Sequence, residues 1–293
     1  MNKTLTLLSF LVFTAFLGGI VYSHADQSIS QSASTTEAQS VSMTKASDRA
    51  HVFSDLKRAA VKDSQGLYVG RITDLVINPD ARISFAVLSP FGMDGIMDGI
   101  NERLVALPFD ALSFNDKYLV LNTTSDKLVT APLFKMSYLN ARNWAKDSNR
   151  YFGIEPSWEE GTLCEKPAVG AHQIPMTKGW NRPYGASEIV GTQVKNPQGE
   201  VVGKIADLVF DDEGRISLAI LGYGGFLGIG QNLVAVPVTS LSYGEEPGRF
   251  VLNSTKENIQ SAPLFSKKAL DDPGWANGVY RYFGQQPYWT REK

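Results

Sequence analysis

The chain of 293 residues contains the same module twice. The stretch GLYVGRITDLVINPDARISFAVL at residues 66–88 aligns without gaps on GEVVGKIADLVFDDEGRISLAIL at residues 199–221, with 12 of 23 positions identical. After loops of different length, LVALPFDALSF at 104–114 matches LVAVPVTSLSY at 233–243. Each repeating unit runs over more than 100 residues, whereas solenoid repeats are far shorter. The repetition therefore predicts two domains built from one duplicated module.

Most of each copy has the pattern of β-strands. Apolar side chains occupy every second position at Ile83, Phe85 and Val87, and the equivalent positions of the second copy repeat this. A period of two is expected for a half-buried strand. Turn-forming residues at 78–80 and 211–214 precede these runs, so a hairpin is predicted in each copy. Short strands with turn residues at this spacing favour a small closed barrel, which leaves no sheet edge exposed.

The end of each copy is aromatic and lacks the strand alternation. RYFG, two further residues, a proline, one residue and a tryptophan occur at 150–158 and again at 281–289. Large aromatic side chains bury about 150–250 Å² each, so these tails are expected to cover part of their barrels. A short helix is expected at Lys267–Asp271. The terminal Trp158 and Trp289 are the candidates for exposed, partner-binding aromatic residues.

These patterns predict an all-β fold with minor α content. The expected architecture is two tandem small β-barrels at residues 51–158 and 187–293, each ending in a short aromatic, partly helical tail. A connector is expected at 159–186. The single cysteine, Cys164, lies in that connector and cannot form an intrachain disulfide, so stability has to come from apolar cores.

Residues 1–25 have the features of a bacterial export signal. A lysine near the start is followed by an apolar run at 5–21 and by a small-x-small cleavage pattern at 23–25. An uncleaved membrane anchor is the alternative, because the run approaches the length that spans a bilayer, and membrane contact is expected only in that case. Residues 26–50 are rich in Ser, Thr, Gln and Ala and predict a flexible linker. The folded part is therefore expected to be exported, either to the periplasm or to the outside of the cell.

Composition and motifs argue against several classes of function. The net charge of -2 and the pI near 6.0 do not suit nucleic-acid binding. The sequence has no G-x-S-x-G nucleophile elbow, and His51 and His172 lack a second ligand at metal-binding spacing. Asp94, Asp98 and Glu102 could collect oxygen ligands for calcium, but the second copy lacks these acids, and a solvated acidic loop is the preferred interpretation. We expect no enzymatic activity, no cofactor and no metal.

The stretch GYGGFLGIGQN at 222–232 has five glycines and could be taken for a phosphate-binding loop. A P-loop requires Lys and then Ser or Thr after its last glycine, but Gln231 and Asn232 hold these positions. The stretch therefore predicts a turn between barrel strands. Its apolar tip either forms an exposed patch that binds another protein or folds inward and plugs the barrel end. The candidate partner-binding residues at this tip are Phe226, Leu227 and Ile229.

Two acidic residues hold equivalent positions in the two copies, Asp74 and Asp207. An acid beside a strand glycine more often accepts hydrogen bonds from backbone amides, or pairs with a nearby arginine such as Arg82 or Arg215, than it acts as a general acid. Duplication of a catalytic group is unnecessary for catalysis, whereas duplication of a structural pair is expected. The equivalence therefore favours a structural role.

The stretch VGKIADLVFDDEGRISLAILGYGGFLGIGQNLVAVPVTSL resembles the PRC-barrel family, the small β-barrel domain of the photosynthetic reaction centre H subunit and of a bacterial ribosome-maturation protein. The first copy resembles this family through VGRITDLVINPDARISFAVL and LVALPFDAL. The resemblance covers residues 54–125 and 187–256. It implies an adaptor-like barrel that binds other macromolecules and has no common catalytic residues.

The expected function is therefore non-catalytic binding, by an adaptor or scaffold at the cell envelope that holds protein partners through two similar surfaces. Two linked weak sites give strong avidity when their spacing suits the partner. The alternative is a periplasmic ligand-binding module for a small molecule, a metal ion or an envelope glycan. A ligand-binding module predicts a preformed cavity with convergent polar groups, whereas a scaffold predicts an exposed apolar patch.

Overall fold

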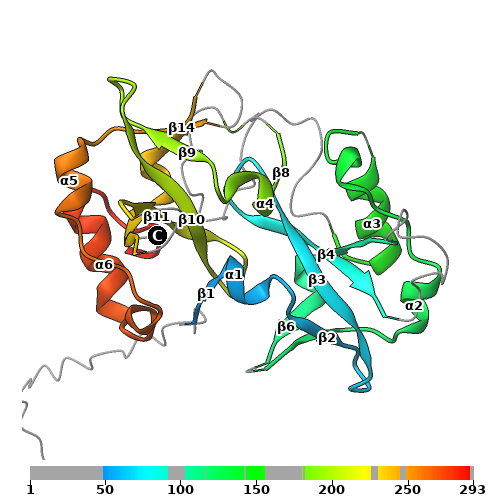
Figure 1. Ribbon diagram of the computed structural model, residues 1–293. Coiled ribbons are helices and arrows are strands. Elements are labelled where there is room, and N and C mark those ends of the chain that lie inside the picture. The colour runs from blue at the N-terminus through cyan, green and yellow to red at the C-terminus, as the bar shows by residue number, and fades with distance from the viewer. Residues whose placement is uncertain are drawn as a thin grey trace, which may run out of the picture. The chain divides into compact units, whose positions relative to one another are not determined.

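The computed structural model describes residues 49–91, 103–115, 117–141, 143–155, 180, 182–225, 230–244 and 249–290. These residues fold into two curled mixed sheets, one from each copy of the repeat, with few helices (Figure 1). The predicted fold class, all-β with minor α content in two tandem barrel-like domains, is confirmed.

The first copy forms a sheet with the strand order β5-β4-β3-β2-β7-β6, in which β2 and β7 run parallel and the other neighbours antiparallel. No pairing between β5 and β6 occurs among the described residues, so the curled sheet is a half-barrel and the closed barrel predicted from the strand spacing is wrong in this respect. Its strands are β2 (Ala60–Lys62), β3 (Tyr68–Ile77), β4 (Ile83–Pro90), β5 (Val105–Pro108), β6 (Leu112–Phe114) and β7 (Leu119–Leu121).

The second copy repeats this topology strand for strand, with the order β12-β11-β10-β9-β14-β13 and a parallel pair between β9 and β14. The predicted hairpins are β3–β4 in the first copy and β10–β11 in the second. The strands are β9 (Gln193–Lys195), β10 (Val201–Asp211), β11 (Ile216–Tyr223), β12 (Asn232–Pro237), β13 (Leu241–Tyr243) and β14 (Arg249–Leu252).

Helices are short, and the α-helices lie at the start and end of each copy. The expected helix at Lys267–Asp271 is present as a 3-10 helix, η4. The α-helices are α1 (Phe53–Leu56), α2 (Asp126–Val129), α3 (Trp144–Phe152), α4 (Ala186–Ile189), α5 (Lys256–Gln260) and α6 (Pro273–Tyr282). The other 3-10 helices are η1 (Phe109–Ala111), η2 (Met136–Tyr138), η3 (Val238–Ser240) and η5 (Tyr288–Thr290).

The tail helices cover the outer faces of their sheets. In the first copy the ring of Trp144 in α3 lies 4.9 Å from that of Phe85 on β4. In the second copy the hydroxyl of Tyr280 in α6 donates a hydrogen bond of 2.8 Å to the carbonyl oxygen of Ser217 on β11. Figure 1 shows α3 and α6 beside the sheets of their own copies. Strand β4 is therefore buried on both faces over much of its length, although its alternation predicted one exposed face.

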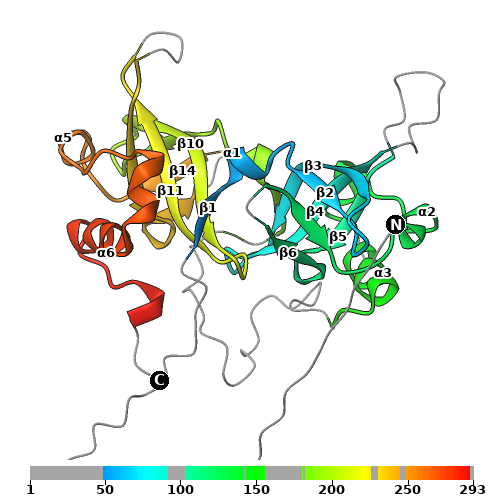
Figure 2. The ribbon, with the colours of Figure 1, turned by 90° about the horizontal axis from the view of Figure 1, so that it is seen from below.

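Each copy sends its leading segment, a very short strand followed by one helical turn, to the other copy. β1 (Ala50–Val52) precedes α1 and pairs antiparallel with β10 of the second copy. Figure 2 shows β1 alongside that sheet. β8 (Tyr184–Gly185) precedes α4 and pairs antiparallel with β3 of the first copy. The exchange is reciprocal, so each seven-stranded sheet contains one strand from the other copy.

The tips of the two predicted hairpins also meet. The amide of Ile83 donates to the carbonyl oxygen of Gly214 at 2.8 Å, and the amide of Ile216 donates to that of Ala81 at 2.9 Å. Beneath them the rings of Phe109 and Phe210 lie edge to face with their centroids 6.3 Å apart. One cluster of buried apolar residues therefore runs through both copies, and the described residues belong to one compact unit.

The exchanged strands begin in segments that the sequence assigned to the connector and the linker. β8 lies inside the segment 159–186 that the sequence assigns to a connector, and Ala50 lies at the end of the expected linker 26–50. Both short strands form their hydrogen bonds with residues more than 100 positions away. A pattern confined to neighbouring residues therefore cannot indicate them.

Candidate functional site

Asp74, a buried acid of the first copy, holds the leading helix of the second copy. Its Oδ1 accepts hydrogen bonds from the amides of Leu75 at 2.8 Å and Ser187 at 3.1 Å. Its Oδ2 accepts a hydrogen bond from the hydroxyl of Ser187 in the first turn of α4. A carboxylate with several donors is suited to holding backbone amides in place.

Asp207 makes the equivalent contact in the opposite direction. Its Oδ1 accepts hydrogen bonds from the amide of Leu208 at 2.9 Å and from that of Ser54 in α1 at 3.1 Å. The two aspartates thus form a reciprocal clasp between the copies. The predicted hydrogen bonds from backbone amides are confirmed for both aspartates.

The two arginines considered as alternative partners lie elsewhere. Arg82 lies 3.6 Å from the carboxylate of Asp110, and its Nε donates to the carbonyl oxygen of Glu213 at 3.0 Å. The Nε of Arg215 lies 2.8 Å from the carboxylate of Asp211. Pairing of Asp74 and Asp207 with these arginines, the second alternative, is therefore wrong, because both arginines lie at the hairpin tips.

Burial raises the pKa of Asp74 above its ordinary value of 3.8. The hydrogen bonds from Ser187 and Leu75 and the positive charge of Lys57 lower the pKa, but they offset only part of the effect of burial. A group whose pKa is raised by folding stabilises the fold most when it is protonated. The contribution of Asp74 is therefore fully present below pH 3.8 and is lost as the pH rises through the raised pKa.

Substitution of Asp74 tests this clasp. In Asp74→Asn the amide oxygen keeps both backbone hydrogen bonds, and the amide nitrogen can donate to the hydroxyl of Ser187. We expect this variant to be at least as stable as the wild type at pH 7 and to lack the gain on acidification. Asp74→Ala leaves buried donors unsatisfied, so we expect it to lose about 2 kcal/mol. Urea denaturation at pH 4 and pH 7 measures both effects, and an Asn variant as unstable as the Ala variant would contradict them.

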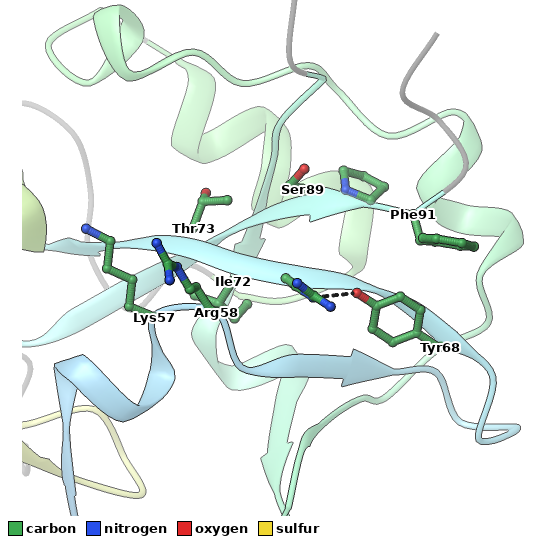
Figure 3. A pocket seen from close by; sticks show the side chains of 9 residues that line it. Lys57, Arg58, Tyr68, Ile72, Thr73, Ser89 and Phe91 are labelled. Atoms are coloured by element: carbon green, nitrogen blue, oxygen red, sulfur yellow. Dashed lines mark hydrogen bonds between the residues drawn. The ribbon is translucent and has the colours of Figure 1, made fainter. Parts of the chain in front are cut away.

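A cavity of about 510 Å³ opens beside the β3–β4 hairpin of the first copy. Figure 3 shows Lys57 and Arg58 projecting on the same side from the turn that follows α1, with Thr73 and Ser89 on the neighbouring strands. We call this cavity the basic groove. It is lined by Lys57, Arg58, Tyr68, Arg71, Ile72, Thr73, Ser89, Pro90 and Phe91.

The basic groove has an excess of positive charge. Within the described residues, no carboxylate lies within 4 Å of the charged groups of Lys57, Arg58 or Arg71. Arg71 is instead oriented by a hydrogen bond of 3.1 Å from its Nε to the hydroxyl oxygen of Tyr68, the dashed line in Figure 3. Lys57 is attracted by the more distant Asp74. Positive charges gathered without ion pairs favour a negatively charged ligand.

The backbone at Arg58 is strained. Its φ is 79°, in the left-handed region that disfavours side chains with a Cβ atom. The equivalent residue of the second copy is Gly191, with a φ of 95°. The amides of Arg58 and Gly191 make the same hydrogen bond of 2.7 Å, to Ile72 and Ile205 respectively. The fold therefore requires a positive φ at this position. Only the second copy has glycine there, the residue that adopts a positive φ without strain.

The second copy does not reproduce the basic groove. Its residues equivalent to Lys57 and Arg58 are Val190 and Gly191, and of the three positive charges only Lys204, equivalent to Arg71, remains. Sequence motifs did not point to the groove, because its three basic residues match no known spacing. The departure from the repeat at these positions was the signal available in the sequence.

A second cavity of about 620 Å³ lies between the leading segment of the first copy, its strands β6 and β7, and η4 of the second copy. His51 on β1 lines this cavity, contacts the carboxylate of Asp212 through its Nε2, and stacks on Phe114 with ring centroids 4.0 Å apart. The imidazole is thus held by a carboxylate and an aromatic ring. No group of three potential metal ligands was found among the residues that the structure describes.

Of the predicted partner-binding residues, Trp289 belongs to the part of the chain that the structure describes. Phe226, Leu227, Ile229 and Trp158 lie outside the described residues. Trp289 in η5 is 39% exposed. Its ring contacts those of Tyr280 and Tyr288 at 5.2 and 4.8 Å, and its Nε1 donates a hydrogen bond of 2.9 Å to the side chain of Asn277. Trp289 is therefore partly packed and keeps an exposed edge.

The structure adds a matched pair of exposed apolar residues that sequence analysis missed. The sequence APLF occurs in both copies, at residues 131–134 and 262–265. Leu133 and Leu264 hold the same place in these two segments and are 57% and 62% exposed. The following phenylalanines face inward, and their amides donate to Leu104 at 2.8 Å and to Leu233 at 2.7 Å. These hydrogen bonds fix the APLF segments against the sheets and leave both leucines facing outward. The repetition of APLF in the sequence was the available signal.

Comparison with protein families matches the PRC-barrel domain twice, at residues 50–128 and 183–259. Comparison with curated proteins finds no match. In the part of the chain that the structure describes, no helix has the length and apolar character needed to cross a membrane.

Proposed function

The chain belongs to the PRC-barrel family, with two domains in tandem, and from this premise we propose that it is a non-catalytic, exported adaptor that binds protein partners at the cell envelope. The pair of exposed leucines, Leu133 and Leu264, carries this proposal. A large apolar side chain exposed at the same place in both copies offers two similar docking points. Two such points on one chain suit bivalent capture of a partner.

Two further observations support the proposal. Asp74 and Asp207, the equivalent acids weighed for a catalytic role, have their carboxylates engaged in the clasp between the copies. Residues 1–25 have the pattern of an export signal. The first observation supports binding rather than catalysis, and the second supports a place of action outside the cytoplasm.

Substitution of the two leucines tests the adaptor function. The chain from residue 26 onward serves as bait for an envelope extract, and the captured protein is then purified for affinity measurements. We expect Leu133→Ser and Leu264→Ser each to lose about a hundredfold in affinity, because loss of either site removes avidity, and we expect the double variant to lose measurable binding. The matched control is Leu67→Ser, since Leu67 is 58% exposed but Glu200 replaces it in the second copy. Unchanged affinity of the double variant would overturn the proposal.

Ligand binding is the second candidate function, because the basic groove provides the preformed cavity with convergent polar groups that this function requires. The groove belongs to the first copy alone, whereas the leucine pair belongs to both. The two functions can therefore coexist, and each is tested by substitutions that leave the other surface intact.

A further inference from the structure

We propose that the basic groove is a binding site for a phosphate group, either free or as part of a phosphate ester. The groove has a volume of about 510 Å³, within the range of about 300–1,000 Å³ typical of small-molecule sites. Lys57, Arg58 and Arg71 bring three positive charges to it, enough to neutralise a phosphate dianion. Arginine and lysine are the side chains that most often recognise phosphate.

The hydrogen-bonding groups of the groove are mainly donors. The Nε of Arg71 donates to the hydroxyl oxygen of Tyr68. Within the described part of the chain neither terminal nitrogen of Arg71 has a hydrogen bond or an ion pair, so both can make the two-pronged contact that phosphate oxygens accept. Because Tyr68 accepts that hydrogen bond, its own hydroxyl proton is free to donate to a ligand. The hydroxyl of Ser89, which Figure 3 shows on β4, adds another donor. An oxyanion satisfies such a set, and a cation does not.

The strain at Arg58 is an independent observation. A residue with a Cβ atom at a φ of 79° is strained, and this conformation persists only when the surrounding structure imposes it. Glycine serves the same backbone position in the second copy, where the cations at 57 and 58 are both absent. Strained conformations concentrate at binding sites. The first copy therefore has arginine at a position where glycine would fit the backbone better, and the side chain of this arginine reaches the basic groove.

One end of the groove is apolar and aromatic. Phe91 is 69% exposed, and its ring lies 5.3 Å from that of Tyr68. Pro90 and Ile72 continue this wall. An apolar wall next to a cluster of cations suits a phosphate ester whose other end is apolar or aromatic. A soluble phosphate ester and the headgroup of an anionic phospholipid share this chemistry.

The test uses the chain from residue 26 onward and two probes. The first probe is inorganic phosphate, measured by isothermal titration calorimetry at constant ionic strength, with acetate as the carboxylate control. The second probe is vesicles of phosphatidylcholine with about one fifth phosphatidylglycerol, measured by co-sedimentation against vesicles of phosphatidylcholine alone. Binding of phosphate without binding to vesicles assigns the groove to a soluble ester, and binding that depends on phosphatidylglycerol assigns it to a lipid headgroup.

Substitutions at Arg58 connect binding to the groove. Arg58→Gly introduces the residue of the second copy, so the fold is expected to remain intact while the affinity falls tenfold or more, the effect of losing one charge-assisted contact. Arg58→Lys keeps the charge and the strain but loses the planar fork, so an intermediate affinity is expected. Lys204→Ala removes the single cation of the equivalent region in the second copy and is expected to leave the affinity unchanged.

Three outcomes would overturn the proposal: no binding of either probe, equal binding of acetate and phosphate, or an Arg58→Gly variant that binds as the wild type does. A folded Arg58→Gly protein is confirmed by circular dichroism and thermal denaturation, so loss of binding cannot be mistaken for loss of structure. None of these outcomes affects the adaptor function, which rests on Leu133 and Leu264.

Discussion

Replacement of Phe210 with alanine is expected to lower the free energy of unfolding by about 3–5 kcal/mol and to destabilise both copies of the module together. Phe210 lies on β10 and is almost completely buried. Its ring contacts Phe109 of the first copy at 6.3 Å and His51 of the exchanged strand β1 at 5.7 Å. Loss of this ring leaves a cavity between the copies, so the cost includes the contacts of both.

The matched control is Phe85→Ala. Phe85 is equally buried, but it packs against Trp144 on the outer face of the first copy, in a separate cluster. Its removal is expected to loosen α3 and its surroundings before the rest of the chain. Both substitutions remove the same side chain, so a difference in which segments respond reflects the position of the ring.

Hydrogen–deuterium exchange followed segment by segment, together with urea denaturation, measures these effects. In Phe210→Ala, faster exchange is expected in β3–β4 and β10–β11 alike, with a single unfolding transition. Faster exchange confined to the second copy would show that the two barrels unfold independently. That result would contradict the shared core and remove the physical basis for treating both copies as one unit.

The shared core also matters for the proposed adaptor function. Avidity depends on whether two sites can engage one partner at the same time. A flexible connector spreads the distance between two sites over many values, whereas a continuous core restricts it. The reciprocal strand exchange and the two aspartate contacts add to that restriction.

The sequence alone was sufficient to predict the hairpins and the repeat. Alternation at Ile83, Phe85 and Val87 identifies a strand because side chains on a strand point to opposite faces. Along β4, the side chains that face the tail helix and those that face the core are both apolar. The burial of both faces therefore becomes clear only once the position of the tail helix is known.

The exchange of leading segments could not be predicted in the same way. β1 and β8 have three and two residues, too few for a periodic pattern, and their partners lie in the other copy. The basic groove escaped prediction for a related reason. Lys57 and Arg58 come from the turn after α1 and Arg71 comes from β3, and the pairing of β2 with β3 brings these segments together.

The second large effect is expected for Gly70→Ala in the β3–β4 hairpin. A Cβ atom at this position would lie 2.3 Å from the carbonyl oxygen of Ser89 and 2.9 Å from the Cα atom of Pro90. Both atoms belong to the backbone of β4, which pairs with Gly70 through Pro90. The φ of 153° is a further obstacle to a side chain. We therefore expect a loss of about 3 kcal/mol or more, since neither strand can move without breaking the register.

Alanine substitutions at two other glycines distinguish the effect of a steric clash from that of backbone strain. Gly66→Ala adds a Cβ atom in open space at a φ of 83°, so only conformational strain remains, at about 1 kcal/mol. Gly203, equivalent to Gly70, would bring its Cβ atom to 3.0 Å from the carbonyl oxygen of Gly222, and an intermediate loss is expected.

Urea denaturation of the three glycine variants gives their order of stability, expected to be Gly66→Ala, then Gly203→Ala, then Gly70→Ala as the least stable. Gly70→Ala also tests the basic groove, because Ser89 and Pro90 line this groove. If Gly70→Ala folds, the displaced β4 shifts the hydroxyl of Ser89, and phosphate affinity should fall although every cation is still present. A Gly70→Ala protein as stable as Gly66→Ala would mean that the strands separate at this point without cost, which contradicts the pairing of Gly70 with Pro90.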